Sequence, residues 1–309
     1  MDPSMNCELA DTGEFPALDK KATASAGAGR VRVDGAGLSH RGLVRPNNED
    51  HFLVARFGRF FTPLSTNVRG QADTVFEEEG HGLVVADGLG GAAAGEVASD
   101  LAIRSLLNLV FETSDWIISP AGSEADRVMK RMAERYRRID DLLVQAANRN
   151  PHLRGMGTTM TLACNVGDSL ILTHVGDSRA YLYRNADLYQ LTHDHTLAQV
   201  LVDQGSLRHV EEASKQMQHT LVRLLGGVGQ QCEADVEHLT LLDQDVVVLC
   251  TDGLTDMVND DAIAAILAAG APAEQTCQTL VDTALKNGGK DNVTVIVARY
   301  GFFGRPSAK

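Results

Sequence analysis

Five aspartates in this 309-residue chain share one setting, a turn with small residues beside it at the end of a strand-like run. They are Asp50, Asp87, Asp177, Asp252 and Asp291. Asp87 is the clearest case, because it follows the apolar run Leu83–Val85 and precedes a glycine-rich turn in which the backbone can approach a ligand. A carboxylate and a neighbouring carbonyl can bind a hard cation there. Each turn alone is weak evidence, since aspartate also favours turns for local hydrogen bonding.

The elements that must position these aspartates are predicted from periodicity. Strands are expected over residues 31–40, 51–55, 81–86, 236–241, 245–251 and 293–300. Helices are expected over residues 94–112, 123–148, 261–269 and 273–286, the first two as an antiparallel pair. Residues 158–165, 170–175 and 180–183 are expected to form an antiparallel meander. Strands and helices segregate rather than alternate, which favours an α+β layered fold.

Three segments are expected to lie outside the regular fold. Residues 1–30 are polar and without periodicity, which predicts a mobile tail, and residues 301–309 are expected to be a second tail. Residues 57–80 mix aromatics with Pro63 and an acidic run, which predicts an inserted loop between two strands. One globular domain is therefore expected over residues 31–300.

The composition excludes several classes of function. Lys and Arg total 28 against 41 Asp and Glu, a formal charge of −13, which argues against nucleic acid as a partner. A phosphate-bearing substrate must then be attracted locally, by metal or arginine. The five cysteines are widely spaced without a Cys-x-x-Cys pair, which argues against disulfides and zinc. No apolar run is long enough for a membrane span, so a cytoplasmic monomer away from the membrane is expected.

Eight short motifs occur along the chain. They are Arg45-Pro-Asn-Asn-Glu-Asp50, Val85-Ala-Asp-Gly-Leu-Gly-Gly91, Gly95-Glu96, Gly155-Met-Gly-Thr-Thr159, Val175-Gly-Asp-Ser-Arg179, Leu191-Thr-His-Asp-His195, Thr251-Asp-Gly-Leu254 and Lys290-Asp-Asn-Val-Thr294. In order and spacing the set resembles the bacterial branch of the metal-dependent serine/threonine protein phosphatases, the PPM or type 2C family. The resemblance implies a four-layer αββα sandwich, two antiparallel sheets flanked by antiparallel helix pairs, with a metal cleft between the sheets.

The resemblance also implies a set of metal ligands. Asp87 would bridge two divalent ions, with the Gly88 carbonyl on one of them. Asp252 and Asp291 would complete one shell, and Asp50 would serve the other ion, mostly through water. These oxygen ligands suit Mn²⁺ or Mg²⁺.

Two further side chains would act on the substrate and the water. Glu49 would orient metal-bound water, and Arg45 would grip the substrate phosphate with its guanidinium fork. Two ions sharing a water would lower its pKa for direct attack on phosphoserine or phosphothreonine, without a phosphoenzyme. Leu89 stands where some members carry a histidine that could protonate the leaving oxygen, so we attribute that proton to metal-bound water.

The implied activity is a serine/threonine protein phosphatase in signal transduction, acting on the substrates of a serine/threonine kinase. The alternative is an inactive family member that senses or scaffolds phosphoproteins, which would be marked by the loss of a metal carboxylate. None is missing here. A nucleotide-binding turn is a weaker alternative, since Ala93 stands where the third glycine is needed.

A third ion raises a choice between two copies of Val-Gly-Asp-Ser. Asp168 lies between two apolar runs and is expected in a hairpin turn, whereas Asp177 precedes Ser178-Arg179 in the order of the family's third-metal motif. We expect Asp177 to share a third ion with Asp252. The nearby His193-Asp194-His195 is expected to be a plain strand-to-helix turn, with Asp194 capping a helix over residues 194–205.

Overall fold

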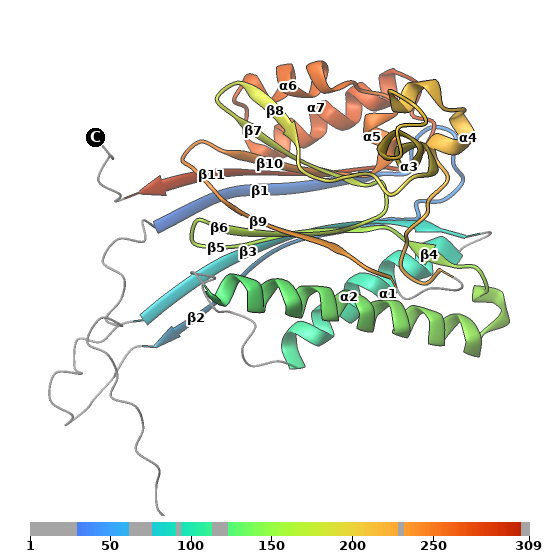
Figure 1. The fold of residues 1–309 in the computed structure, drawn as a ribbon. Coiled ribbons are helices and arrows are strands. Elements are labelled where there is room, and N and C mark those ends of the chain that lie inside the picture. Colours follow the sequence, from blue (N-terminus) through green and yellow to red (C-terminus); the bar gives the residue numbers. More distant parts are fainter. Residues whose placement is uncertain (1–29, 62–75, 91–93, 113–122, 228–231, 304–309) are drawn as a thin grey trace, which may run out of the picture.

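The computed structural model describes residues 30–61, 76–90, 94–112, 123–227 and 232–303. Within them the chain forms four layers, with two antiparallel sheets in the middle and helices outside (Figure 1). Helices α1 (Ala94–Glu112) and α2 (Ser123–Arg149) cover one sheet, and α6 (Asp260–Ala268) and α7 (Ala273–Lys286) cover the other. The predicted α+β sandwich is confirmed.

The first sheet has the strand order β1-β11-β10-β7-β8. Its strands are β1 (Arg30–His40), β7 (Arg179–Arg184), β8 (Asp187–Gln190), β10 (Val246–Cys250) and β11 (Val293–Phe303). All neighbouring strands are antiparallel. As a result the end of β1, the end of β10 and the beginning of β11 lie at the same edge of the sheet.

The second sheet has the strand order β2-β3-β5-β6-β9, and a short strand β4 pairs with the end of β3. Its strands are β2 (Asp50–Phe61), β3 (Phe76–Leu89), β4 (Gly157–Thr158), β5 (Met160–Val166), β6 (Ser169–Val175) and β9 (Asp235–Thr240). Here the beginning of β2 and the ends of β3 and β6 share one edge.

Apolar side chains fill all three spaces between the four layers. One cluster joins α1 and α2 to the second sheet around Tyr136 and Leu143, and another joins α6 and α7 to the first sheet around Leu280. The third lies between the sheets, where Leu83 and Leu249 have no exposed surface. Because strands of both sheets are apolar on both faces, their residues read as continuous apolar runs.

The expected three-stranded meander is wrong in its third strand. β5 and β6 pair as expected, but β7 lies in the other sheet and pairs with β8 and β10. The chain crosses between the sheets at residues 175–179, where Gly176 has a φ of +113°, a value that L side chains rarely adopt. Its position against Thr159 leaves no room for a Cβ.

The expected loop over residues 57–80 is also wrong at both ends. β2 continues to Phe61 and β3 begins at Phe76, so the two strands form a long ladder that pairs Phe57 with Gly80. Gly80 lies against the Phe57 ring, where a side chain could not fit. Residues 57–61 and 76–80 therefore belong to paired strands, and residues 62–75 lie outside the described residues.

Smaller differences concern element ends. The helix expected over residues 194–205 is α3 (Leu197–Asp203), capped by Thr196, whose side chain accepts from the Gln199 N–H. β11 runs three residues past the expected domain boundary, because Gly301–Phe303 pair with the start of β1. The expected tail over residues 1–30 lies outside the described residues except for Arg30, and the remainder of the second tail, residues 304–309, lies outside them too.

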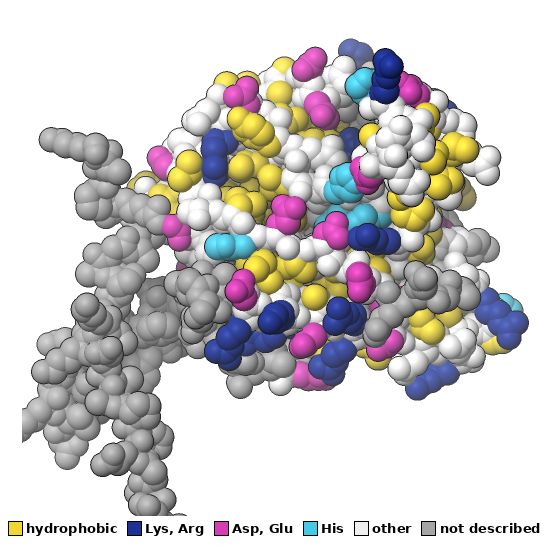
Figure 2. Space-filling view, in the orientation of Figure 1, with side chains coloured by type: hydrophobic (Ala, Val, Ile, Leu, Met, Phe, Trp, Pro, Cys, Tyr) yellow, Lys and Arg dark blue, Asp and Glu magenta, His cyan; other side chains and the backbone are white. Residues whose placement is uncertain are grey.

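Short helices complete the fold. They are η2 (Pro151–Leu153), η3 (Val210–Glu212), α4 (Lys215–Gln218) and α5 (Asp252–Thr255). Figure 2 shows many of the Lys and Arg side chains of this face over the lower helical layer, while acidic side chains are spread over the whole face. None of the helices in the described part of the chain is long and apolar enough to cross a membrane.

Candidate metal centre

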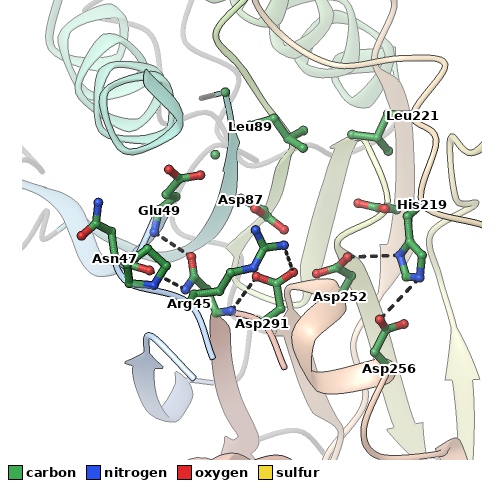
Figure 3. Close-up of a pocket in the computed structure, with 15 residues that line it drawn as sticks. Arg45, Asn47, Glu49, Asp87, Leu89, His219, Leu221, Asp252, Asp256 and Asp291 are labelled. Atoms are coloured by element: carbon green, nitrogen blue, oxygen red, sulfur yellow. Dashed lines mark hydrogen bonds and ion pairs between the residues drawn. The ribbon is translucent and has the colours of Figure 1, made fainter. Parts of the chain in front are cut away.

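The five aspartates singled out from the sequence meet at one edge of the two sheets. The register places Asp50 at the start of β2 directly opposite Asp87 near the end of β3. A pocket of about 600 Å³ opens there, and the side chains of Asp87, Asp252 and Asp291 point into it (Figure 3). Asp177 also lines this pocket, from the crossing between β6 and β7.

The first sheet supplies two of these carboxylates. Asp252 begins α5 directly after β10, and Asp291 lies just before β11. Since β10 and β11 are antiparallel neighbours, the two residues come from strand ends that lie side by side. Opposing sheets thus contribute to a single cluster.

Asp50 is buried, and its two oxygens differ. Oδ2 accepts hydrogen bonds from the hydroxyls of Thr251 (2.8 Å) and Thr294 (2.7 Å). Oδ1 is buried without a hydrogen-bond partner. A buried unpaired carboxylate oxygen costs free energy, so it points to a cation or a water that lies within reach when the site is loaded. Burial raises the pKa of Asp50 to about 7.

The electrostatics of the cluster also fit divalent cations. Burial, followed by repulsion from Asp50 and Asp252, raises the pKa of Asp87 well above its usual range. Burial and Asp252 do the same to the pKa of Asp177. Like charges held this close are unfavourable without a compensating cation, and the donors are all oxygen, as Mn²⁺ and Mg²⁺ prefer.

Thr158 and Thr159, from the motif Gly155-Met-Gly-Thr-Thr159, hold the backbone around Asp87. The role of this motif was not evident from the sequence. The Asp87 N–H donates to the Thr159 hydroxyl (3.0 Å), and the Asp87 carbonyl accepts from the Thr158 hydroxyl (2.8 Å). Gly88 passes so close to the Gly95 carbonyl of α1 that a Cβ would collide with it. β3 therefore continues through Asp87 to Leu89 instead of ending at the aspartate as expected.

Arg45 and Glu49 flank the carboxylates. Arg45 Nη2 lies 2.6 Å from Asp291 Oδ2, and this hydrogen bond raises the pKa of the guanidinium. Burial raises the pKa of Glu49. Asn292 holds this loop in place: its Oδ1 accepts from the Glu49 N–H (2.7 Å), and its Nδ2 donates to the Asn47 carbonyl (2.8 Å).

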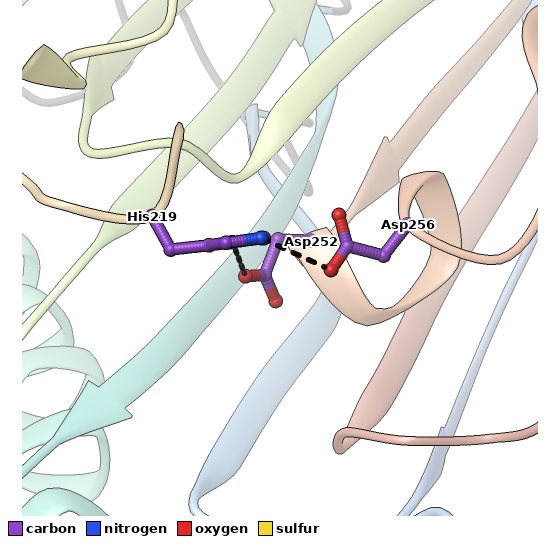
Figure 4. A group of neighbouring side chains, drawn as sticks. All are labelled: His219, Asp252 and Asp256. Carbon is purple, nitrogen blue, oxygen red and sulfur yellow. Dashed lines mark ion pairs between the residues drawn. The ribbon is translucent and has the colours of Figure 1, made fainter. Parts of the chain in front are cut away.

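His219 and Asp256 were not predicted from the sequence as site residues, yet both line the pocket. The ring of His219 lies between Asp252 and Asp256, with Nδ1 and Nε2 each 3.6 Å from one carboxylate (Figure 4). Asp256 follows Asp252 by one helical turn, a spacing that could have suggested it. His219 follows α4 in a polar stretch without a motif, and nothing in the sequence distinguishes it.

Other candidate residues lie elsewhere. Asp168 is in the β5–β6 turn, at the opposite end of β6 from Asp177, and its carbonyl accepts from the Leu241 N–H. Asp194 caps no helix; its carboxylate instead binds Arg179 at the base of β7 (2.6 Å). His195 is buried and pairs through Nε2 with Asp235 (3.0 Å).

The described cysteines cannot act as nucleophiles at neutral pH. Cys164, Cys232, Cys250 and Cys277 lie in the apolar clusters, and burial raises the pKa of each thiol to about 12. None of them lines the pocket. The chemistry of the site therefore rests on its oxygen donors, Arg45 and His219.

An αββα sandwich with an oxygen-rich metal cleft between its sheets defines the class of metal-dependent phosphatases. Residues 70–287 match the family described as protein phosphatase 2C. The chain belongs to this family, and its similarity to bacterial proteins places it in the bacterial branch.

Relatives support the same assignment. The chain is 35% identical to "Serine/threonine protein phosphatase PstP" of Mycobacterium tuberculosis over 85% of its own length and 44% of that protein's. It is 32% identical to "Serine/threonine phosphatase stp" of Listeria welshimeri over 70% of its own length and 82% of that protein's. The chain thus spans less than half the length of the mycobacterial relative.

Solved structures agree with the fold. The serine/threonine phosphatase of S. agalactiae matches with a TM-score of 0.71 at 27% identity, covering 88% of this chain and 100% of that one. The catalytic domain of PstP "in complex with 2 Manganese ions" matches with a TM-score of 0.66 at 32% identity, covering 88% of this chain and 100% of that one.

Proposed function

We propose that this protein hydrolyses phosphoserine and phosphothreonine in proteins, using two Mn²⁺ or Mg²⁺ ions and no phosphoenzyme. The observation that carries the proposal is the convergence of five aspartates from separate segments: four line one pocket, and the fifth, Asp50, lies buried opposite Asp87 with one oxygen left without a partner. The two Mn²⁺ ions named for the PstP catalytic domain support the choice of metal.

The chain's own groups divide the work. Asp87 would bridge both ions, with the Gly88 carbonyl on one of them. Asp252 and Asp291 would complete the shell of one ion, and Asp50 would serve the other, mostly through water. When bound, the ions supply a water of lowered pKa and neutralise charge on the phosphate. Gly88 can serve because it lacks the side chain that would collide with α1.

Arg45 and Glu49 would act on the substrate and on water. Arg45 is half exposed and lines the pocket, so its guanidinium can bind two phosphate oxygens while it stays beside Asp291. Glu49 lies at the mouth beside Arg45, where its carboxylate can orient water. Neither side chain must move across the pocket to do so.

A third ion is proposed between Asp177 and Asp252. The repulsion between these two carboxylates, which helps raise the pKa of Asp177, supports the pairing. Phosphorylated substrates of a serine/threonine kinase would be the partners, in keeping with the names of the relatives.

The alternative, an inactive member that senses phosphoproteins, predicts binding without turnover. The experiment is phosphate release from a phosphothreonine peptide, with Mn²⁺ and after chelation, by the wild type and Asp252→Ala. We expect turnover only for the metal-loaded wild type. Binding of the peptide by wild type without phosphate release would favour the inactive alternative instead.

A further inference from the structure

Two leucines line the same pocket as the carboxylates. Leu89, at the end of β3, leaves 38% of its surface exposed, although residues Leu83–Ala86 of the same strand are buried. Leu221 is half-buried and lies in the segment between α4 and β9. Figure 3 shows the two side chains pointing toward one another above Asp87 and Asp252. We call this pair, Leu89 and Leu221, the apolar rim.

Backbone pairing holds both residues of the rim in place. Leu89 pairs with Gly157 of β4, and Leu221 bridges to Thr196 at the start of α3. The two leucines are therefore presented at the mouth by two separate segments. An apolar surface fixed beside an otherwise polar pocket gains free energy when a ligand covers it.

We propose that the apolar rim binds an apolar side chain of the substrate, two positions from the phosphorylated residue, and so selects the protein segments that are hydrolysed. The inference rests on the proposed phosphatase function. In an extended peptide, residues i and i±2 point to the same side. When the phosphorylated side chain enters the pocket, the side chains two positions away therefore face opposite margins of the pocket. Since both leucines lie on one margin of the pocket, the rim can contact the side chain at −2 or the one at +2, but not both.

The charge of the pocket excludes acidic neighbours. Its lining carries six carboxylates, those of Glu49, Asp87, Asp177, Asp252, Asp256 and Asp291, and one guanidinium, that of Arg45. Two divalent ions would leave the lining with one negative charge, and three would leave it with one positive charge. Since the substrate phosphate adds a charge of about −2, the lining and the phosphate together would stay negative in either case. An acidic side chain beside the phosphorylated residue is thus repelled, while an apolar one meets the rim.

The test is a panel of phosphothreonine peptides with alanine at the flanking positions, and versions with Leu or Glu at −2 or at +2. With Mn²⁺, we expect kcat/KM for Leu at one of these positions to exceed that for Ala by about tenfold, or about 1.4 kcal/mol. Glu should lower kcat/KM, and the loss should shrink at high salt. A wild-type ratio near one at both positions would overturn the proposal.

Variants locate the effect. In Leu89→Asn and Leu221→Asn the Leu-to-Ala ratio should fall toward one. In Leu242→Asn, a matched change at an exposed leucine beyond β9, it should stay at the wild-type value. A ratio unchanged in both rim variants would contradict the assignment. If a variant does not fold, the wild-type panel alone decides.

Hydrolysis of p-nitrophenyl phosphate separates the two claims, because this substrate has no flanking residues. Mn²⁺-dependent hydrolysis without selectivity among peptides would overturn the inference and leave the proposed function intact. Failure to hydrolyse either the aryl phosphate or any of the peptides would overturn both.

Discussion

At the residue scale, the centre depends on carboxylates that repel one another. Asp50 and Asp87 are direct cross-strand partners, and like charges in that position destabilise a sheet. The hydroxyls of Thr251 and Thr294 offset part of this cost at Asp50. A divalent cation would remove the repulsion that remains between Asp50 and Asp87. The carboxylates that the proposed function needs therefore destabilise the metal-free protein.

Asp87→Asn should therefore change activity and stability in opposite directions. Losing the bridging carboxylate should lower Mn²⁺-dependent hydrolysis by at least about 100-fold. Relief of repulsion should raise the melting temperature of the chelated protein, by about 2–4 °C for each kcal/mol gained. Calorimetry and aryl phosphate assays measure both. Activity within a factor of two of wild type would show that Asp87 is not a ligand.

The two Val-Gly-Asp-Ser copies permit a matched comparison. Asp177→Ala should lower turnover while two ions still bind, because Asp177 lies in the pocket and Asp252 contributes to its raised pKa. Asp168→Ala, at the far end of β6, should be nearly silent. Turnover and Mn²⁺ stoichiometry of both variants should be measured together. Equal losses from the two would refute the third-ion assignment.

At the element scale, the site forms because strands from two sheets end at one edge. Much of this was predictable: the helices at 94–112 and 273–286 agree to the residue, and the strands that carry Asp87 and Asp252 were found. The position of β7 in the first sheet, rather than beside β6, was not predictable. Apolar runs separated by short polar turns look alike whether the next strand pairs locally or crosses over, and periodicity carries no information on partners.

The same limit applies within the site. The proposed ligands were recognisable by motif. Thr159 and Asn292 belong to two of the same motifs, but their supporting roles were not predictable, because they depend on contacts with Asp87 and with the Asn47–Glu49 loop, which are distant in the chain. His219 comes from a segment with no period or motif at all. Its place beside Asp252 depends on how α3 and α4 fold back over the pocket.

The approach of β3 to α1 is testable at Gly88. Gly88→Ala puts a Cβ against the backbone of Gly95, so α1 must shift, and we expect a loss of about 1–3 kcal/mol of unfolding free energy in the chelated protein. The control is Gly35→Ala in β1, where the nearest atom, Val54 Cγ1, is at an ordinary 3.6 Å. Urea denaturation should show the control within about 0.5 kcal/mol of wild type. A similarly small loss of unfolding free energy in both variants would contradict the close approach of β3 to α1.

β6 carries a buried histidine that should make stability depend on pH. His174 Nε2 donates to the His193 carbonyl and Nδ1 accepts from Thr161, so the neutral ring is fully hydrogen-bonded. Burial, followed by the neighbouring His195, lowers the pKa of His174 to about 3. Between this value and about 6.5 the unfolded chain binds a proton that the folded chain does not, so stability falls as pH falls.

The expected slope from His174 is about 1.4 kcal/mol per pH unit between pH 6 and 4. Urea denaturation of the chelated protein at several pH values gives the free energy of unfolding for wild type and for His174→Gln. The difference between the two pH profiles isolates the contribution of His174, because the carboxylate cluster contributes equally to both. The exposed His152→Gln serves as control. Parallel pH profiles for wild type and His174→Gln would contradict a buried neutral ring.

At the scale of the whole molecule, the proposed metal centre would join the two halves of the sandwich. The second sheet contributes Asp50 and Asp87, the first contributes Asp252 and Asp291, and the crossing strand connection contributes Asp177. Ions bound there would cross-link layers that also meet through the apolar cluster between the sheets and through the hydrogen bonds of Asp50 with Thr251 and Thr294. Binding should accordingly stabilise the entire fold by mass action, by about 2.7 kcal/mol at a hundredfold excess over Kd.

The central claim is that ions held by this cluster make the protein a phosphatase. It is tested most directly by titrating Mn²⁺ into the chelated protein and measuring, in the same samples, bound Mn²⁺ and the rate of aryl phosphate hydrolysis. We expect no hydrolysis without metal and a rate of hydrolysis that appears as the second ion binds. Full activity in the presence of chelator, or two bound ions with no hydrolysis, would contradict it.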